Sequence, residues 1–282
     1  MQRRTVPRRT APVAGCLLGL TCLGMGGLML AGCGGGGGGG NGPSDISTGA
    51  SGRLQNVQIG PRAGSAFVSP ATTFQLSWTA AAPPPATFGV LLRRYLEPRG
   101  GESKDTSTQN IFVSRQGPGF VYNVGRKDGF HLDTGGVYYL DLHSGAGDTQ
   151  QAAFIADGGP TVAGNQSTQT VSPGMGGSLS GLTTVPAPGS VNIPKNTAFV
   201  LSWAGPTPPP SQFTVALHRY KEARGTDTGG NEEQNITVSG QGVNVWRVRR
   251  KDDYDLESDG TYYLEVSAPG QDPVRAVYIT SS

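Results

Sequence analysis

The chain has 282 residues, of which 45 are Gly and 21 are Pro, while only 15% are charged and three are His. Glycine at about twice its usual share excludes a coiled coil or a helical bundle, and the low charge excludes a highly charged disordered protein. The same composition leaves few of the side chains from which most active sites are built.

The first 32 residues have the pattern of an export signal. Four arginines within residues 3–9 form a basic start without an acidic residue, and residues 13–30 are apolar. The next motif, Leu30-Ala31-Gly32-Cys33, resembles the lipobox of bacterial lipoproteins, in which the Cys is acylated and becomes the new N-terminus. We therefore expect a signal peptide over residues 1–32 and acyl chains on Cys33. The alternative is a retained transmembrane anchor, because the apolar run is just long enough to span a bilayer.

Removal of this leader changes the cysteine count and the charge of the chain. Cys16 and Cys22 leave with it, so no thiol remains for a disulfide. Four arginines leave as well, so the 22 Lys and Arg fall to 18 against 20 Asp and Glu, and the net charge changes from +2 to −2. The exported chain therefore gives no support for nucleic-acid binding. By resemblance to Gram-negative lipoproteins, Gly34 in place of a retaining Asp favours the outer membrane.

Two segments rich in small polar residues divide the rest of the chain. Residues 33–52 are predicted to be the lipidated Cys and a Gly-rich tether, and residues 157–180 an interdomain linker, because such compositions cannot bury a core. A flexible linker argues against a fixed pocket between the parts that it joins. The parts are module 1, residues 53–156, and module 2, residues 181–282, each long enough for a core of its own.

The two modules are copies of one another. Phe74–Trp78, Pro83–Pro85, Arg94–Tyr95 and Gln109–Ile111 recur 125 residues later as Phe199–Trp203, Pro208–Pro210, Arg219–Tyr220 and Gln234–Ile236. Gly136–Leu140 recurs 124 residues later as Gly260–Leu264. A match of this length and spacing indicates an internal duplication.

Apolar and polar residues alternate in the repeated segments, as they do in strands with one buried face. Predicted strands contain residues 74–78, 90–92, 122–124, 138–142 and 153–155 in module 1, and 199–203, 215–217, 246–248, 262–266 and 277–279 in module 2. Gly and Pro separate them, and no stretch has helical spacing over three turns. The predicted fold class is all-β, with two tandem sandwiches after a disordered signal and tether.

The modules resemble fibronectin type III domains, which are immunoglobulin-like sandwiches. That family has a Trp in its second strand and a Leu six residues before a Tyr that opens a late strand. The matching positions are Trp78 and Trp203 for the Trp, and Leu132 with Tyr138 and Leu256 with Tyr262 for the pair. The resemblance implies a fold and no activity. The long polar stretch 97–108 leaves a different immunoglobulin-like subtype open.

One predicted strand of module 2 is basic on a single face. Arg247 and Arg249 alternate with Trp246 and Val248, so the two arginines share the face opposite the apolar side chains. Such a stripe can bind lipid A phosphates, acidic polysaccharide or an acidic protein; the alternative is a charged outer face that keeps the sheet soluble. The candidate ligand-binding residues are Arg247, Arg249, Arg250 and Lys251.

The other candidates for chemistry have weaker patterns. Asp253, Asp255 and Glu257 lie in an acidic loop of the kind that binds calcium, but Ser258 stands where an EF-hand has Gly, and a solvated loop is the alternative. The histidines are far apart, and we interpret them as solvated loop or strand-surface residues: His131, His143 and His218. No nucleophile elbow or cofactor motif is found.

One tyrosine in each module is a candidate for sugar binding. Tyr139 and Tyr263 are predicted to be exposed opposite the core-facing Tyr138 and Tyr262, where they could stack on sugars. We expect a non-catalytic, lipid-anchored envelope protein that binds or adheres to an envelope protein or polysaccharide. The alternatives are a structural spacer or assembly subunit and, more remotely, an enzyme.

Overall fold

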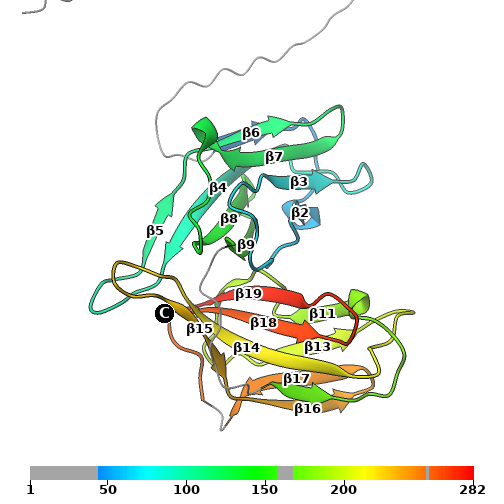
Figure 1. Cartoon of the computed structure of the whole chain (residues 1–282). Helices are drawn as coiled ribbons and strands as arrows, with labels where there is room; N and C mark the ends of the chain where they lie inside the picture. The colour runs from blue at the N-terminus through cyan, green and yellow to red at the C-terminus, as the bar shows by residue number, and fades with distance from the viewer. Residues whose placement is uncertain (1–43, 158–167, 252–253) are drawn as a thin grey trace, which may run out of the picture. The chain divides into compact units, whose positions relative to one another are not determined.

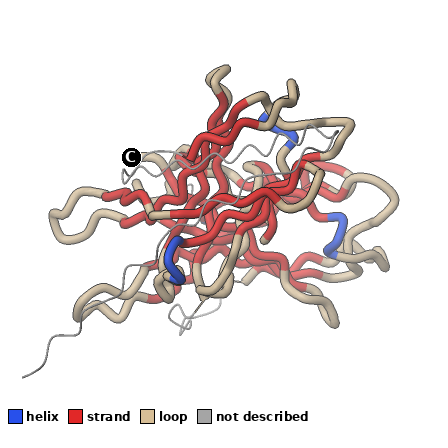
Figure 2. Tube along the Cα trace, turned by 90° about the horizontal axis from the view of Figure 1, so that it is seen from above, coloured by secondary structure: helices blue, strands red, loops and turns tan. Residues whose placement is uncertain are grey.

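A computed structural model describes residues 44–157, 168–251 and 254–282, and almost all regular structure in them is β (Figures 1 and 2). Module 1 contains β1 (Ser44–Ser47), β2 (Gln58–Gly60), β3 (Phe74–Trp78), β4 (Thr87–Leu96), β5 (Asp105–Thr108), β6 (Ile111–Arg115), β7 (Phe120–Arg126), β8 (Val137–Ser144) and β9 (Thr149–Ile155). Two short 3-10 turns, Leu54–Asn56 and Lys127–Gly129, complete it. In the described residues, no helix is long and apolar enough to cross a membrane.

Module 2 repeats this order with one added strand. It contains β10 (Gln169–Val171), β11 (Leu182–Val185), β12 (Val191–Ile193), β13 (Phe199–Trp203), β14 (Phe213–Lys221), β15 (Gly230–Gln234), β16 (Ile236–Gly242), β17 (Val245–Arg250), β18 (Thr261–Ser267) and β19 (Val274–Thr280), with a 3-10 turn at Leu179–Gly181. The added strand β12 pairs in parallel with β19, whereas module 1 has only an isolated parallel bridge, Val68 to Ala156, at the corresponding place.

Each module is a sandwich of two sheets. In module 1 the order is β1-β4-β8-β9, with β5 also on β4, facing β2-β3-β7-β6. In module 2 it is β10-β14-β18-β19-β12, with β15 also on β14, facing β11-β13-β17-β16. The predicted fold class is confirmed, and the polar stretch 97–108 is the turn between β4 and β5 together with β5 itself.

The Trp and Tyr positions that resemble those of fibronectin type III domains have the structural roles that the resemblance implied. Trp78 and Trp203 lie in separate cores, one for each module, and donate their indole N–H to Arg53 O at 3.2 Å and Ser178 O at 2.8 Å. The hydroxyls of the two corner tyrosines accept the backbone N–H five residues upstream: Asp133 to Tyr138 and Glu257 to Tyr262, each at 2.8 Å. These bonds anchor the turn before β8 and β18.

The predicted tether and linker each contain a short strand that belongs to a sandwich. β1 lies in the 33–52 segment and pairs with β4, and β10 lies in the 157–180 segment and pairs with β14. Strand pairing uses backbone N–H and C=O groups, so a segment of small polar residues can join a sheet without an apolar pattern. One sheet of each sandwich therefore includes a short strand from the segment that precedes the module.

Candidate functional site

The two modules pack against each other within one compact unit, an arrangement that the sequence of the linker left open. Their contact is centred on the ends of β4 and β14, where the duplicated residues meet. Arg94 pairs with Glu222, and Arg219 Nη1 lies 2.7 Å from Glu97 Oε2. The four side chains are 5–11% exposed, so both ion pairs are largely shielded from water.

Further bonds hold these charged groups. Arg94 also donates to Asp133 at 2.8 Å and to the hydroxyl of Tyr138 at 3.0 Å. Glu97 accepts from Arg99 as well, at 3.1 and 3.2 Å. A buried ion pair stabilises a contact only if such additional bonds replace the lost hydration.

Burial acts in opposite directions on the pKa values of Arg219 and Glu222. Burial lowers the pKa of Arg219, but the charge and hydrogen bond of Glu97 outweigh it, so the pKa is raised above its ordinary value. Burial raises the pKa of Glu222, and Arg94 and Arg224 reverse this only in part. Glu222 Oε2 also lacks a hydrogen-bond partner among the described residues. The Glu97 end is therefore the better satisfied of the two.

Tyrosines connect the modules in the same reciprocal way. The hydroxyl of Tyr95 donates to Asp259 O at 2.6 Å, and that of Tyr220 donates to Gly135 O at 2.5 Å. Tyr139 and Tyr263, predicted to be exposed, are only 8% and 2% exposed, because this sheet face of each module is covered by the other module. The prediction of sugar-stacking tyrosines is therefore wrong.

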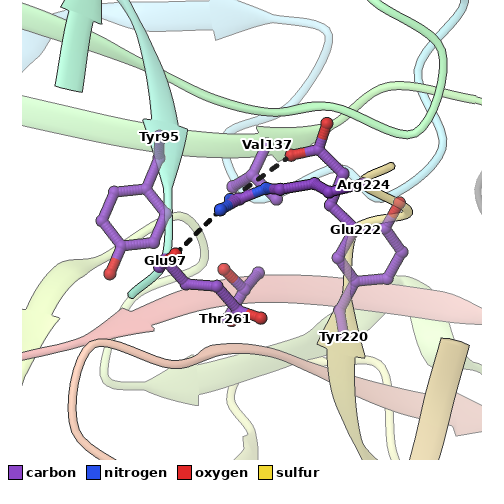
Figure 3. Close-up of a pocket in the computed structure, with 7 residues that line it drawn as sticks. All are labelled: Tyr95, Glu97, Val137, Tyr220, Glu222, Arg224 and Thr261. Atoms are coloured by element: carbon purple, nitrogen blue, oxygen red, sulfur yellow. Dashed lines mark hydrogen bonds and ion pairs between the residues drawn. The ribbon is translucent and has the colours of Figure 1, made fainter. Parts of the chain in front are cut away.

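A pocket between the modules is filled by its own side chains. It is lined by Tyr95, Glu97, Val137, Tyr220, Glu222, Arg224 and Thr261 (Figure 3). Arg224 crosses it and donates to Glu97 O at 2.9 Å, with Glu222 3.8 Å away. No space for a ligand remains between these groups. The arrangement is suited to holding two modules together and not to binding a small substrate.

The predicted basic stripe lies on β17, on the outer face of module 2. Arg247 is exposed, Arg249 is half-buried, and Val248 between them is buried in the core. In the register, Arg247 is opposite Val200 on β13 and Ser239 on β16.

The other two residues of the basic set lie apart from the stripe. Arg250 turns towards the following loop, where it donates to Asp255 O at 2.5 Å and lies over the ring of Tyr254. Lys251 is exposed beyond the end of β17. The structure thus assigns Arg247 and Arg249 to the sheet face, with Arg250 and Lys251 at its rim.

The acidic loop has a structural use for one of its carboxylates. Glu257 lies 3.2 Å from Arg219, and Asp255 is exposed, whereas Asp253 lies outside the described residues. Within the described part of the chain, no three His, Cys, Asp or Glu side chains are grouped as metal ligands. The lipobox residues Leu30, Ala31 and Gly32 and the lipidated Cys33 also lie outside the described residues.

The three histidines are in different environments. His131 is exposed and His143 is half-buried over Gly89. His218 is buried and stacks on Tyr263, with 4.5 Å between ring centroids and 13° between ring planes, so its assignment to the solvated surface is wrong. Burial lowers the pKa of His218, although Glu265 and Glu233 oppose this shift.

Sequence reasoning missed the four charged residues of the contact. The repeated Arg94–Tyr95 and Arg219–Tyr220 were visible, but their partners are 128 and 122 residues away in the chain. One signal was present: each Arg is followed three positions later by a Glu, Glu97 or Glu222. Charged residues repeated in both copies at the end of an apolar strand indicate a shared contact.

Comparisons with known proteins concern the fold alone. No protein-family model matches the chain, and no curated protein matches it. The copper resistance protein PcoC from Escherichia coli is 17% identical, with 36% of this chain and 96% of that chain covered and a TM-score of 0.26. The N-terminal Ig1-2 module of the Drosophila receptor protein tyrosine phosphatase DLAR is 12% identical, with 85% and 97% covered and a TM-score of 0.19. These TM-scores are too low to support an argument; the strand order itself defines a tandem pair of immunoglobulin-like sandwiches.

Proposed function

We propose that this chain is a lipid-anchored protein of a Gram-negative cell envelope, with a non-catalytic role in binding an acidic envelope component. One observation carries the proposal: Arg247 and Arg249 project from the outer face of module 2, away from the contact between the modules. Among the described residues, Arg247 has no ion-pair partner. Its charge is therefore free to meet an anion from solution.

The surroundings of the stripe suit an extended anionic ligand. Arginines two residues apart on one strand face are about 7 Å from each other, and guanidinium groups bind carboxylate or phosphate through two parallel hydrogen bonds. Thr237 and Ser239 on β16 are exposed beside them and add hydroxyl donors. A flat sheet face of this kind fits an acidic polysaccharide or an acidic protein surface better than a small molecule.

Module 1 provides the matched control for a binding experiment. At the positions of Arg247 and Arg249 it has Asn123 and Gly125, and Asn123 lies opposite Gln75 and Ser114 on the neighbouring strands. Tagged residues 44–282, which contain every described strand, would be mixed with acidic polysaccharide and, separately, with envelope extract. Retention in sedimentation and pull-down assays would be compared for the parent, R247S/R249S and N123S/Q75S.

The expected result is that R247S/R249S loses at least about tenfold in retention, since each charged contact contributes on the order of 1–3 kcal/mol, while N123S/Q75S behaves like the parent. Retention by polysaccharide alone would identify a glycan ligand, and retention of a discrete protein from the extract would identify a protein partner. Equal retention by both variants would contradict the assignment of the site to β17.

The anchor is tested separately in the full chain. A Cys33→Ala variant should move from the membrane to the soluble periplasmic fraction, because the acyl chains supply the membrane affinity. If that variant stayed with the membrane, the lipidation proposal would be wrong, and the result would leave the β17 site unaffected.

A spacer or assembly role is a second candidate, favoured by the buried ion pairs that hold the modules together. Its functional variable would be length, so deleting one module would impair envelope function while R247S/R249S would be silent. The binding proposal predicts the opposite sensitivity to R247S/R249S.

A further inference from the structure

The contacts between the modules occur in reciprocal pairs. Arg94 binds Glu222, and Arg219 binds Glu97. Arg219 is the copy of Arg94 and Glu222 the copy of Glu97, each 125 positions later, so the Arg of each module binds the Glu of the other. The tyrosine bonds are exchanged in the same manner, from Tyr95 to Asp259 and from Tyr220 to Gly135.

The backbone repeats the exchange. Ala153 N–H donates to Gly189 O and Val277 N–H donates to Gly64 O, both at 2.8 Å. Gly64 and Gly189 approach so closely that a Cβ on Gly64 would lie 2.5 Å from Gly189 N, and a Cβ on Gly189 would lie 2.8 Å from Gly64 N. Three independent kinds of contact therefore follow one pseudo-two-fold relation.

We propose that this contact is self-complementary, so that either module can bind a second copy of itself through the same surface. This pairing surface consists of Gly64, Arg94, Tyr95, Glu97, Gly135 and Ala153 in module 1, and of Gly189, Arg219, Tyr220, Glu222, Asp259 and Val277 in module 2. The partner is a second copy of this chain, and the inference is independent of the ligand proposed for β17.

The physical reason is the rule for two-fold interfaces: if residue i contacts residue j of the partner, then j contacts i. The side chains that make the reciprocal bonds are of the same type in both copies, with Arg, Tyr and Glu at equivalent positions. A second module 1 placed where module 2 lies would therefore set Arg94 against Glu97 of the other copy, and Tyr95 against Gly135 O of the other copy. No unpaired charge would be buried.

A module with this surface uncovered would have reason to associate. The surface includes a buried apolar cluster separate from the two cores, formed by Tyr95, Val137, Tyr139, Ala153, Ile155, Tyr220, Tyr263, Val277 and Ile279. Contiguous apolar surface of this kind is typical of an interaction site. In the intact chain the other module covers it.

Contacts without a counterpart favour pairing within the chain. Lys104 lies 2.9 Å from Asp259, and module 2 has Gly229 at the position equivalent to Lys104. Arg275 lies over the ring of Phe67, 5.5 Å from its centroid. Two copies of one module would lack these contacts, and the linker gives the intramolecular partner an effective concentration in the millimolar range. Self-association should therefore appear only when the intramolecular match is broken.

Charge inversion in the full chain breaks that match and keeps self-complementarity. In R219E/E222R, Arg94 and Glu97 each face a side chain of their own charge within the chain, but each module still matches a second copy of itself. In the fourfold variant R94E/E97R/R219E/E222R, the ion pairs between the modules are restored, although the new carboxylates at positions 94 and 219 lie beside Asp133 and Glu257 as they do in the double variants. The fourfold variant contains the same substitutions, so it controls for their effect on folding.

The measurement is molar mass by size-exclusion chromatography with light scattering, with circular dichroism to verify the fold. We expect R219E/E222R to have at least twice the mass of the parent chain and the fourfold variant to return to the parent mass. The mirror variant R94E/E97R should behave like R219E/E222R, so the test does not depend on one module tolerating the change. Folded double variants that keep the parent mass would overturn the proposal.

Discussion

The inner and outer faces of the two modules differ in how far the copies have diverged. At the pairing surface both copies have Arg, Tyr and Glu at equivalent positions, whereas on the outer sheet Arg247 and Arg249 replace Asn123 and Gly125. A two-fold contact constrains both copies equally, because a substitution in one copy leaves its buried partner in the other copy unpaired. The residues of the outer face are not constrained in this way. A function present in one copy alone is therefore expected on the outer face.

The largest expected effect is on stability, when one of the two buried carboxylates of the contact, Glu97 or Glu222, is neutralised. Glu97→Gln should destabilise the chain by about 3 kcal/mol, because it removes the buried carboxylate that pairs with both Arg219 and Arg99 and leaves Arg219 only the exposed Glu257. Glu222→Gln should cost only about 1–2 kcal/mol. Arg94 retains Asp133 and the Tyr138 hydroxyl as acceptors, and burial already raises the pKa of Glu222. Urea unfolding of both variants measures the difference.

Acidification distinguishes the same two variants. Because the folded-state pKa of Glu222 is raised, its ionisation costs stability as pH rises above the ordinary value near 4.5, and this cost is absent at lower pH. The penalty of Glu222→Gln should therefore grow as the pH is lowered towards 4.5. Equal penalties for both variants at every pH would show that the two ion pairs are equivalent.

The close approach of the two glycines gives the next effect. Gly64 has φ +79°, and a Cβ there would meet Gly189 N at 2.5 Å, so Gly64→Ala combines backbone strain with a clash between modules. Gly147→Ala is the matched control, with φ +84° and open space around it. The control should cost about 1–2 kcal/mol for the left-handed conformation, and Gly64→Ala at least about 2 kcal/mol more. Thermal unfolding of the two variants tests this; equal costs would mean that the modules separate freely.

Much of each sandwich could be predicted from local sequence patterns. Alternation identified the buried face around Trp78, and the Leu–Tyr spacing identified the corner at Tyr138. Alternation cannot say whether the opposite face meets water or another module, which is why Tyr139 was predicted to be exposed. β1 was not predicted, because it is held by backbone bonds to β4 and not by an apolar pattern of its own.

The contact itself was beyond such patterns because its ion pairs join residues about 125 positions apart. The duplication showed which residues are equivalent, but not that equivalent residues meet. For the basic stripe, the sequence predicted the positions of Arg247 and Arg249 on one strand face, and the structure separates them from Arg250, which turns towards the loop at Asp255.

A smaller effect on stability is expected at the two corner tyrosines, Tyr138 and Tyr262. Tyr138→Phe and Tyr262→Phe each remove the acceptor of one backbone N–H, which should cost about 1 kcal/mol. Tyr138→Phe also removes an acceptor from Arg94, whereas Arg219 meets Tyr262 through its ring, at 5.3 Å. Tyr138→Phe should therefore be the more destabilising by a few tenths of a kcal/mol in denaturant unfolding. The reverse order would indicate that Arg94 does not depend on the Tyr138 hydroxyl.

The smallest effect concerns a site where the copies have diverged beside the contact. Module 1 has Arg93, paired with Asp141 at 3.3 Å, where module 2 has the buried His218 between Glu233 and Tyr263 on the neighbouring strands. Burial lowers the pKa of His218 below its ordinary value near 6.5, even though Glu265 and Glu233 favour the charged form and Arg275 disfavours it. The unfolded chain then binds the proton more tightly, so stability is complete above about pH 6.5 and falls as the pH drops below it.

His218→Phe keeps a ring stacked on Tyr263 and removes the titrating group. The stability of the parent relative to this variant should therefore decrease when unfolding is measured at pH 5 instead of pH 7. In His131→Gln, which changes an exposed histidine, the acid-dependent loss should persist. If His218→Phe lost stability on acidification as steeply as the parent, the buried histidine would have no part in it.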